Sequence, residues 1–459
     1  MTFRILPLIL LCLSLVTSKA QTKQITSITV SGNEKTKDFV ILRELIIYSD
    51  SSYTDNQLDE LLFQSKNRIL NLNLFNHVEI SQHRKNKDSL EIGIKISVVE
   101  KWFIWPMPFV EFSDRNFNVW GNLNFDPKRT NYGLYVFSYN LFGRNHTLKT
   151  KAKTGYNTKL GIEYRIPFLS RNTQWGLNSN IEHKSQNEVW IETRNDSLQF
   201  FKNGDNNLIK TTKAEFEFSK RVQPFVRYIF NAKFLFDELS SSVPTRDYFL
   251  NNADYQQHYR VGFRIEHDTR DNIYFPLRGT FISPRIGIEL FRNTTNLSNI
   301  NFKFKAQQFN QFRKKWYTAF SVYSNINTSN SLPYSDRKQL GYDEIVRGFE
   351  HYVIDGHLGF KGNAAVRYHL LDKSNLRLNF IPIKNYQMLP TNIYLELFSD
   401  GGYTESSNIN ISNQLPGKLL YSGGLGINTL FYNDRLLRLE YSLNSLKEGG
   451  FFVHFQKAI

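Results

Sequence analysis

Thiols are almost absent from the sequence, which has one cysteine, Cys12, among 459 residues. Cys12 lies in an apolar N-terminal segment that we expect to be removed, so the remaining chain would hold neither disulfides nor a cysteine-based metal or redox site. No later run of about 20 apolar residues occurs, which excludes a bundle of membrane-spanning helices. The motifs G-x-S-x-G, H-E-x-x-H and G-x-x-x-x-G-K-[ST] are also missing. We therefore expect neither an enzyme nor a cofactor or metal site.

The N-terminal segment has the three parts of a secretory signal peptide. Arg4 supplies a positive charge, residues 5–16 form an apolar core, and Ser18 and Ala20 are the small residues that precede a cleavage site. The apolar core is too short to span a bilayer. Cys12 follows a leucine rather than a small residue, which disfavours a lipid anchor. We expect a signal peptide at residues 1–20 and cleavage after Ala20.

Aromatic residues are abundant at 15%, although the mean hydropathy is −0.43. This combination is typical of a transmembrane β-barrel, because only alternate residues face lipid and aromatic girdles mark both interfaces. The net charge is +15. Basic residues alternate with apolar ones along predicted strands, as at Lys149, Lys151 and Lys153. We interpret them as lining a polar lumen, so we do not expect nucleic-acid binding.

Residues 24–100 alone combine helix and strand patterns. An apolar alternation ends at Gly32, and Thr36 is a candidate cap for a helix over 39–46. Thr54 and Gln57 form a capping box that opens a second helix. The apolar face of that helix is formed by Leu58, Leu61, Leu62, Ser65 and Ile69.

Two strands follow these helices, one around Val78 and Ile80 and one over 90–98, where apolar residues alternate most regularly. The resulting order β-α-α-β-β predicts two helices packed on a small sheet.

From Trp102 onward the sequence shows only strand patterns. Segments of about ten residues have one apolar and one polar face, for example over 160–166 and 259–266. The length allows about 22 residues for each strand and turn of a sixteen-stranded barrel. Polar inserts at 183–210, 238–256 and 326–345 are predicted to be extracellular loops.

Two short motifs stand out in the barrel region. The first is Val346-Arg347-Gly348-Phe349, which follows a polar insert. The second is Phe398-x-Asp400-x-Gly402, in a strand whose alternation places Phe398 and Asp400 on the lumen side. A guanidinium binds a carboxylate through two parallel hydrogen bonds, so an arginine on a loop inside the barrel would suit Asp400.

A cluster of His267, Asp268 and Asp271 resembles a metal site, but we expect these carboxylates to pair with nearby arginines such as Arg264 and Arg270.

These features together resemble the BamA/TamA superfamily, also called the bacterial surface antigen family. The family's POTRA pattern matches residues 30–33, 40–45, 74–80 and 98–100. In that family a V-R-G-F/Y tetrapeptide lies at the tip of the sixth extracellular loop, and its arginine contacts acidic residues of an F-x-D-x-G strand. The resemblance thus implies that Arg347 contacts Asp400. Two further similar stretches are residues 268–279 and 423–441.

The resemblance implies a mainly β fold: a transmembrane antiparallel barrel of about 16 strands (102–459) preceded by one small α+β POTRA domain (21–101). It implies a bacterial outer-membrane protein with its POTRA domain in the periplasm. The implied role is to receive unfolded outer-membrane or surface proteins and to insert or export them. Its expected partners are membrane lipids, these clients, and periplasmic or lipoprotein subunits that bind the POTRA domain.

Two rival functions remain open: a passive pore or dedicated secretion channel, and a structural protein with a plugged barrel. A single POTRA domain departs from assembly factors of the BamA type, which carry several.

A lateral seam is predicted where the first and last strands meet. Pro106 and Pro108 lie two residues apart in the first strand and delete ladder donors on one side. Gly449 and Gly450 open the closing strand, which ends near Phe455. Such a seam would part for an incoming client strand. The alternative is that the prolines mark only the linker to the barrel.

Overall fold

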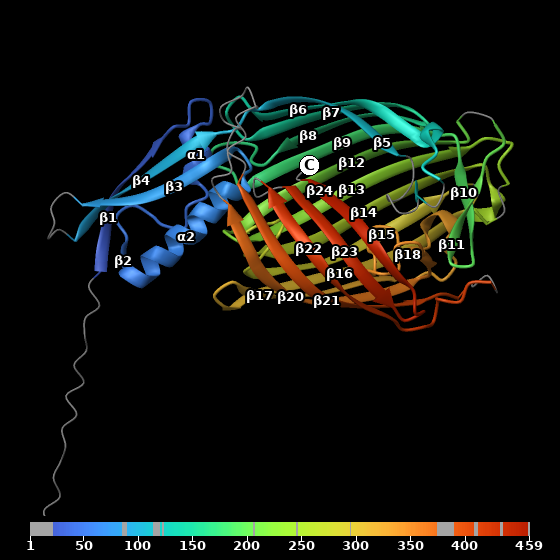
Figure 1. Ribbon diagram of the computed structural model, residues 1–459. Coiled ribbons are helices and arrows are strands. Elements are labelled where there is room, and N and C mark those ends of the chain that lie inside the picture. The colour runs from blue at the N-terminus through green and yellow to red at the C-terminus, as the bar shows by residue number, and fades with distance from the viewer. Residues whose placement is uncertain are drawn as a thin grey trace, which may run out of the picture.

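The computed structural model describes residues 22–84, 90–112, 120–121, 124–204, 207–244, 247–293, 295–373, 390–407, 412–431 and 435–457. The predicted signal peptide lies outside the described residues. Figure 1 shows a small N-terminal domain at one end of a β-barrel. We call the barrel end beside this domain the near end and the opposite end the far end. Among the described residues, no helix is both long and apolar enough to cross a bilayer.

The N-terminal domain is a four-stranded sheet with two helices. Its strands lie in the order β2-β1-β4-β3, with β1 and β4 parallel and the other neighbours antiparallel. The elements are β1 (Thr22–Ser31), α1 (Asp38–Leu42), β2 (Ser52–Thr54), α2 (Asp55–Asn71), β3 (Phe75–Arg84) and β4 (Glu91–Glu100).

The first helix differs from the prediction. It is only five residues long, and its cap is Lys37 rather than Thr36. The hydroxyl of Thr36 instead donates to Glu100 at 2.5 Å and accepts from Asn140 of the barrel at 2.8 Å, so tertiary contacts override its local capping preference. The short strand β2 was not predicted.

The second helix begins as predicted. The backbone N–H of Thr54 donates to the Gln57 side chain at 3.2 Å, which is half of a capping box. The apolar face of α2 packs on the sheet around Ile94, which is completely buried. The core of the domain comprises Ile25, Val40, Ile41, Leu45, Ile47, Leu58, Leu62, Ile69, Leu74, Phe75, Val78, Ile92, Ile94, Ile96, Val98 and Phe103.

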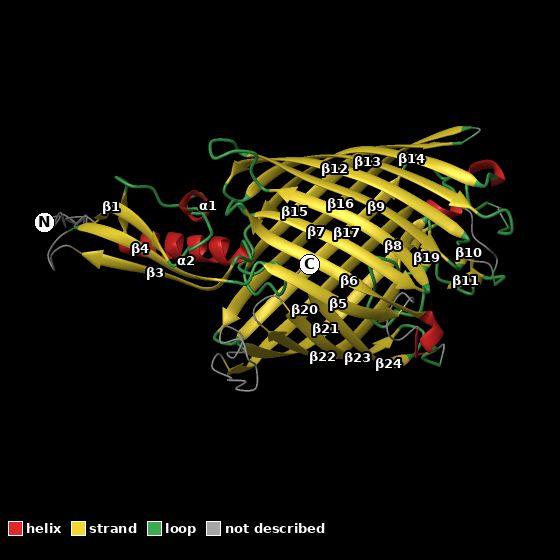
Figure 2. Cartoon of the chain, turned by 90° about the horizontal axis from the view of Figure 1, so that it is seen from above, coloured by secondary structure: helices red, strands yellow, loops and turns green. Residues whose placement is uncertain are grey.

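Most of the described strands after residue 101 form the predicted sixteen-stranded antiparallel sheet, whose order runs from β5 to β24. Strands that follow each other within this sheet are adjacent. Figure 2 shows its strands inclined to the long direction of the barrel. The strands are β5 (Ile104–Phe112), β6 (Thr130–Leu141), β7 (His146–Gly155), β8 (Asn157–Ile166), β9 (Trp175–Gln186), β12 (Ile209–Gln223), β13 (Val226–Leu239), β14 (Tyr255–Asp268), β15 (Gly279–Arg292), β16 (Asn296–Arg313), β17 (Trp316–Asn327), β20 (Leu358–Lys373), β21 (Thr391–Glu405), β22 (Leu420–Phe431), β23 (Arg435–Asn444) and β24 (Gly449–Lys457).

Alternate residues face opposite sides of the barrel wall. In β21, Leu397 is 59% exposed on the outer face, whereas Glu396 and Phe398 are each 3% exposed on the inner face. This is the predicted pattern of an apolar exterior and a polar lumen.

The predicted loops contain structure that the sequence did not reveal. Residues 183–186 belong to β9, and the following insert holds a hairpin of β10 (Val189–Arg194) and β11 (Ser197–Phe201) at the far end (Figure 1). The loop between β17 and β20 contains the two-stranded pair β18 (Lys338–Leu340) and β19 (Ile354–Asp355). The described part of the barrel also contains the 3-10 turns η1 (Pro127–Arg129), η2 (Leu250–Asn252) and η3 (Tyr334–Asp336).

The N-terminal domain is docked on the near-end turns of the barrel through a buried carboxylate. Glu44 accepts from Arg68 of α2 at 2.7 Å and from Arg221 of β12 at 2.8 Å. Burial lowers the pKa of the Arg68 guanidinium, and the charge of Glu44 raises it in part. Arg43 donates to the backbone carbonyl of Arg171, in the β8–β9 turn, at 2.8 Å. The domain therefore contacts the first half of the barrel.

Replacing Ile94 by Asp is expected to unfold the N-terminal domain. Removing such a buried aliphatic side chain costs about 2 to 5 kcal/mol, and burying a carboxylate adds to that. Limited proteolysis should then degrade the domain, while the barrel keeps its heat-modifiable mobility on gels.

Lys95→Asp is the matched control, because Lys95 is the exposed neighbour in β4. If Ile94→Asp also abolishes heat-modifiable mobility, the domain and the barrel do not fold separately.

Candidate functional site: a loop arginine held by three carboxylates

The predicted V-R-G-F motif lies in the loop of residues 328–357, which joins β17 to β20. Val346, Arg347 and Phe349 are 2%, 8% and 3% exposed. Their burial follows from contacts with inner-face residues of β21–β24, so the loop tip lies inside the barrel.

Arg347 binds Asp400 as the motifs predicted. Its Nε lies 3.1 and 3.0 Å from the two Asp400 oxygens, and its Nη2 lies 2.7 Å from Oδ1. The backbone N–H of Arg347 also donates to Asp400, at 3.2 Å. The guanidinium lies over the ring of Phe398, 3.6 Å from its centroid. The motif's aromatic residue and its acid therefore hold the same side chain by different interactions.

Two further carboxylates complete the site. Nη1 of Arg347 donates to Glu396 at 2.7 Å and to Glu440 of β23 at 3.1 Å. Sequence analysis did not assign either residue to the site, although both lie on the polar side of an alternating strand. Sequence alternation therefore identified the correct face of the wall but could not identify which of its acids meet the loop.

The three carboxylates are matched by three arginines. Arg367 of β20 donates to Glu396 at 2.6 Å, and Arg438 of β23 lies 3.6 Å from Glu440. With Arg347, the cluster therefore has equal numbers of acidic and basic groups, which is the condition for charges to be stable in a buried site.

Gly402 and Gly348 provide the space that the loop needs. A Cβ at Gly402 would lie 2.6 Å from the Val346 side chain and 2.9 Å from Leu340, so only glycine lets the loop lie this close to β21. Gly348 has a φ of +86°, which glycine adopts without strain. Its carbonyl accepts from Asn444 of β23 at 2.8 Å.

The loop also reaches the end of β23 and the last strand. Glu350 lies 3.7 Å from His454 of β24, and Tyr352 donates to Glu448 in the β23–β24 turn at 2.7 Å. Together with the Arg347 contacts, these join the loop to β21, β23 and β24. The loop is thus a brace for the C-terminal strands of the sheet.

The predicted seam residues lie on the two end strands of the sheet. Pro106 and Pro108 are in β5, opposite Val136 and Leu134 of β6. The seam residues of β24 are Gly449, Gly450 and Phe455, and this strand pairs with β23.

In the candidate metal cluster, Asp268 has an arginine as its partner. Asp268 pairs with Arg270 at 2.6 Å, as expected, whereas Arg264 pairs with Glu217 and Glu266. Over the described part of the chain, no three His, Cys, Asp or Glu side chains are grouped to hold a metal ion.

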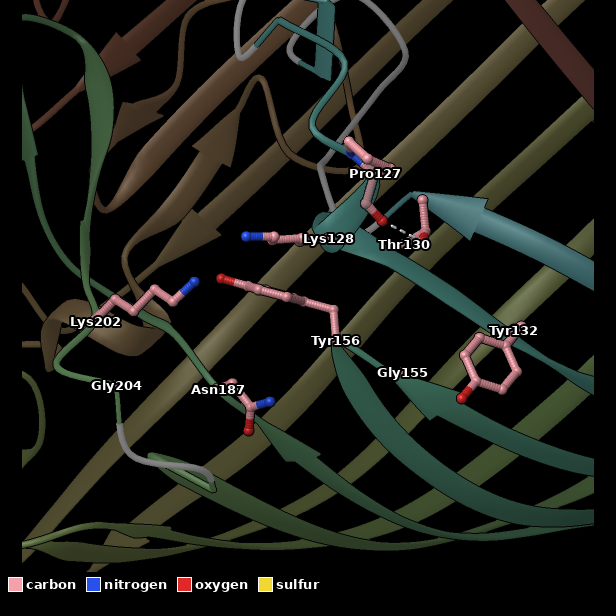
Figure 3. Close-up of a pocket in the computed structure, with 9 residues that line it drawn as sticks. All are labelled: Pro127, Lys128, Thr130, Tyr132, Gly155, Tyr156, Asn187, Lys202 and Gly204. Carbon is pink, nitrogen blue, oxygen red and sulfur yellow. Dashed lines mark hydrogen bonds between the residues drawn. The ribbon is translucent and has the colours of Figure 1, made fainter.

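A cavity of about 390 Å³ lies at the far end, away from Arg347. Figure 3 shows the side chain of Lys128 above Tyr156 and that of Lys202 beside its hydroxyl end, with Asn187 below. Tyr156 is held by Glu188, to which its hydroxyl donates at 2.5 Å. The residues that line this cavity include no histidine, cysteine or carboxylate.

Replacing Arg347 by Ala is expected to lower barrel stability by about 3 to 5 kcal/mol, because Asp400 would remain buried without its partner. Arg347→Lys should lose part of this stability, since an ammonium cannot make the two parallel bonds of a guanidinium. The urea midpoint of the folded barrel in detergent measures both effects.

Arg194→Ala is the control, because Arg194 makes an exposed ion pair in the β10–β11 hairpin. An unchanged midpoint for Arg347→Ala would mean that the cluster does not hold the loop.

Comparisons with known proteins agree with this architecture. The family model described as the Omp85 superfamily domain matches residues 140–429, and the POTRA model, described as surface antigen variable number repeat, matches residues 24–101. The outer membrane protein assembly factor BamA of Neorickettsia risticii (strain Illinois) is 33% identical over 73 residues. That alignment spans 16% of this chain and only 9% of the relative.

Two solved structures share the fold at low sequence identity. BamA from Haemophilus ducreyi lacking POTRA domains 1–3 is 14% identical, with a TM-score of 0.51 over 95% of this chain and 83% of that chain. CdiB from Escherichia coli is 9% identical, with a TM-score of 0.54 over 94% and 75%. Because the Omp85 model matches more than half of the sequence and the POTRA model matches the N-terminal domain, the chain belongs to the Omp85 superfamily.

Proposed function

We propose that this protein lies in the bacterial outer membrane, with its POTRA domain in the periplasm, and inserts or translocates polypeptides there through lateral opening of the barrel. The observation that carries the lateral route is the position of the Arg347 brace, which joins β21, β23 and β24 on the β24 side of the β5–β24 seam.

The outer face of the barrel supports a membrane location. Large apolar side chains are exposed on it along successive strands, as a lipid environment requires. Two exposed tryptophans lie at its near end, where Trp175 and Trp316 begin their strands. Tryptophan favours a membrane–water interface, because its large apolar ring carries one polar N–H.

The loops at the far end favour a lateral exit over passage along the lumen. Asp196, at the tip of the β10–β11 hairpin, accepts backbone hydrogen bonds from Gln414 and Leu415 of the β21–β22 loop. Its own carbonyl accepts from the N–H of Val353 in the Arg347 loop at 2.9 Å. Three loops are therefore joined to each other, and a chain leaving through the far end would have to separate them.

The composition of β5 favours a weak seam. The β5–β6 ladder is continuous across Pro106 and Pro108. A proline inside a paired strand turns its missing N–H away from the paired neighbour, so both prolines remove donors from the side of β5 that faces away from β6. On the other side of the seam, Gly449 and Gly450 lack side chains that could stabilise a register with β5.

Different contacts brace the two sides of this seam. The Arg347 loop joins β21, β23 and β24. In the POTRA domain, Glu44 binds Arg221 of β12 and Arg43 binds the turn that follows β8. Each side therefore has its own support, and the boundary between them is where the sheet separates at least cost.

The POTRA domain would receive clients and partners at β3. This strand is at one end of the four-stranded sheet, and residues 81–84 are exposed. An extended polypeptide can add to such an edge through main-chain hydrogen bonds, which demand little of its sequence. Unfolded outer-membrane or surface proteins, and periplasmic or lipoprotein partners, are the chains that this edge fits.

A disulfide across the seam tests the lateral route. Val110 of β5 and Phe451 of β24 are 78% and 80% exposed on the outer face, and Val110→Cys is paired with Phe451→Cys. The protein is reconstituted in liposomes, and insertion of a urea-unfolded barrel protein is followed by its heat-modifiable mobility. Oxidation should stop insertion while the barrel stays folded, and a reductant should restore it.

The matched control keeps the same β5 cysteine and moves its partner to β6. Tyr132 is directly opposite Val110, so Val110→Cys with Tyr132→Cys crosslinks two strands that stay paired. This control should insert clients normally when oxidised. If the seam-locked protein works as well as the control, the lateral route is wrong and a secretion channel through the lumen takes its place.

A further inference from the structure

Basic side chains on the inner wall lie directly opposite one another across neighbouring strands. Lys153 of β7 is opposite Lys159 of β8, which is in turn opposite Lys184 of β9. A second series begins at Lys233 of β13, which is opposite Arg260 of β14.

A further series, again of three residues, lies on β14, β15 and β16. Arg264 of β14 is opposite Arg285 of β15, which is opposite Lys303 of β16. We call Lys153-Lys159-Lys184 and Arg264-Arg285-Lys303 the two cationic rows.

The cationic rows face the lumen. Lys305, two residues after Lys303, pairs at 3.0 Å with Glu344 of the loop inside the barrel. Residues two apart in a strand share a face, and directly opposite residues share it as well, so the whole second row faces inward. In the first row, Leu160 follows Lys159 and is 63% exposed, and Ile181, three residues before Lys184, is 51% exposed. Both face outward, so the alternation places Lys159 and Lys184 on the inner face.

Carboxylates of the wall neutralise only part of these rows. Lys153 pairs with Glu111 at 2.7 Å and Lys159 with Glu182 at 2.5 Å. Arg264 has the two glutamate partners already described. For the remaining three cations, no carboxylate lies within ion-pair distance among residues that the structure describes. These three are Lys184, Arg285 and Lys303.

Like charges directly opposite each other destabilise a sheet, and here the arrangement recurs in five cross-strand pairs. A sheet optimised for stability alone would not repeat this pairing of like charges. Positions that depart from local rules in this way are expected at functional sites, where a ligand offsets the repulsion.

The wall already binds one carboxylate that comes from a loop. Glu344 lies 3.0 Å from both Lys305 and Lys361 of β20. The inner surface therefore accepts an acidic side chain carried by a polypeptide inside the lumen. The cationic rows offer the same chemistry at side chains that this loop acid does not contact.

We propose that the two cationic rows bind an extended, acidic segment of polypeptide inside the lumen. The proposal rests on the proposed function, in that a client or partner chain enters the barrel. Side chains on one face of an extended segment recur about every 6.5 to 7 Å, and neighbours within a row lie about 4.5 to 5.5 Å apart, a difference that flexible lysine and arginine side chains span. A glycolipid headgroup fits less well, because lipid contacts the outer face.

A labelled peptide tests the proposal on the full-length protein folded in neutral detergent. The probe is a twelve-residue peptide in which Glu alternates with Thr, and its binding is followed by fluorescence anisotropy. The triple variant Lys184→Gln, Arg285→Gln, Lys303→Gln should bind it at least about tenfold more weakly, because charge-assisted contacts are lost. The same peptide with Gln in place of Glu should not bind.

The matched control removes three charges elsewhere, as Lys95→Gln, Lys314→Gln and Lys418→Gln, which are exposed positions outside the lumen. It should bind the acidic peptide as the unmodified protein does. The urea midpoint of the row variant should rise, since repulsion is relieved; this also confirms that weaker binding is not misfolding.

Equal binding by the row variant and the unmodified protein would overturn the proposal. So would binding of inorganic tripolyphosphate at the rows without binding of the peptide, which would indicate a phosphate ligand. The proposed function fails separately: the seam-locked protein should still bind the peptide, because binding needs no lateral opening. Normal insertion by that locked protein would contradict the lateral route without contradicting the proposal of an acidic-peptide site.

Discussion

The contact between Arg347 and its three carboxylates fixes the loop inside the barrel, and most other features of the C-terminal strands depend on it. Once the guanidinium lies against Asp400, Val346 lies over Gly402 and the Gly348 carbonyl meets Asn444. Removing the arginine would leave its carboxylates buried without this partner, so the ion pairs stabilise the loop in this position. The loop enters from the far end of the barrel and therefore acts as a structural part of the sheet.

A second arginine–carboxylate site does the same for the N-terminal half. Glu44 is 3% exposed and is held by arginines from the POTRA domain and from the barrel. The two sites share their chemistry but act on opposite sides of the sheet. In both sites, a guanidinium binds the buried carboxylate better than an ammonium would, because its planar group makes directional hydrogen bonds to it.

Patterns with a local physical cause could be predicted from the sequence. The alternation in β21 predicted which face Asp400 occupies, and the motif resemblance predicted its partner. The capping box at Thr54 predicted the start of α2 because its hydrogen bonds are local. Thr36 shows the limit of such prediction. Its hydroxyl donates to Glu100 and accepts from Asn140, which are 64 and 104 residues away in sequence. Glu440 was missed for the same reason, since only the closed barrel brings it to the loop.

The brace also constrains the order in which the barrel can be built. Gly402, Asn444 and His454 contact the loop from three strands, at positions 50 to 100 residues or so later in the chain. Closing those strands first would leave their acids facing one another, and the loop would then have to carry a charged side chain past a packed wall. We therefore expect the loop to be inside before the last quarter of the sheet forms, and we expect this step to be slow, because its contacts join positions far apart in the chain.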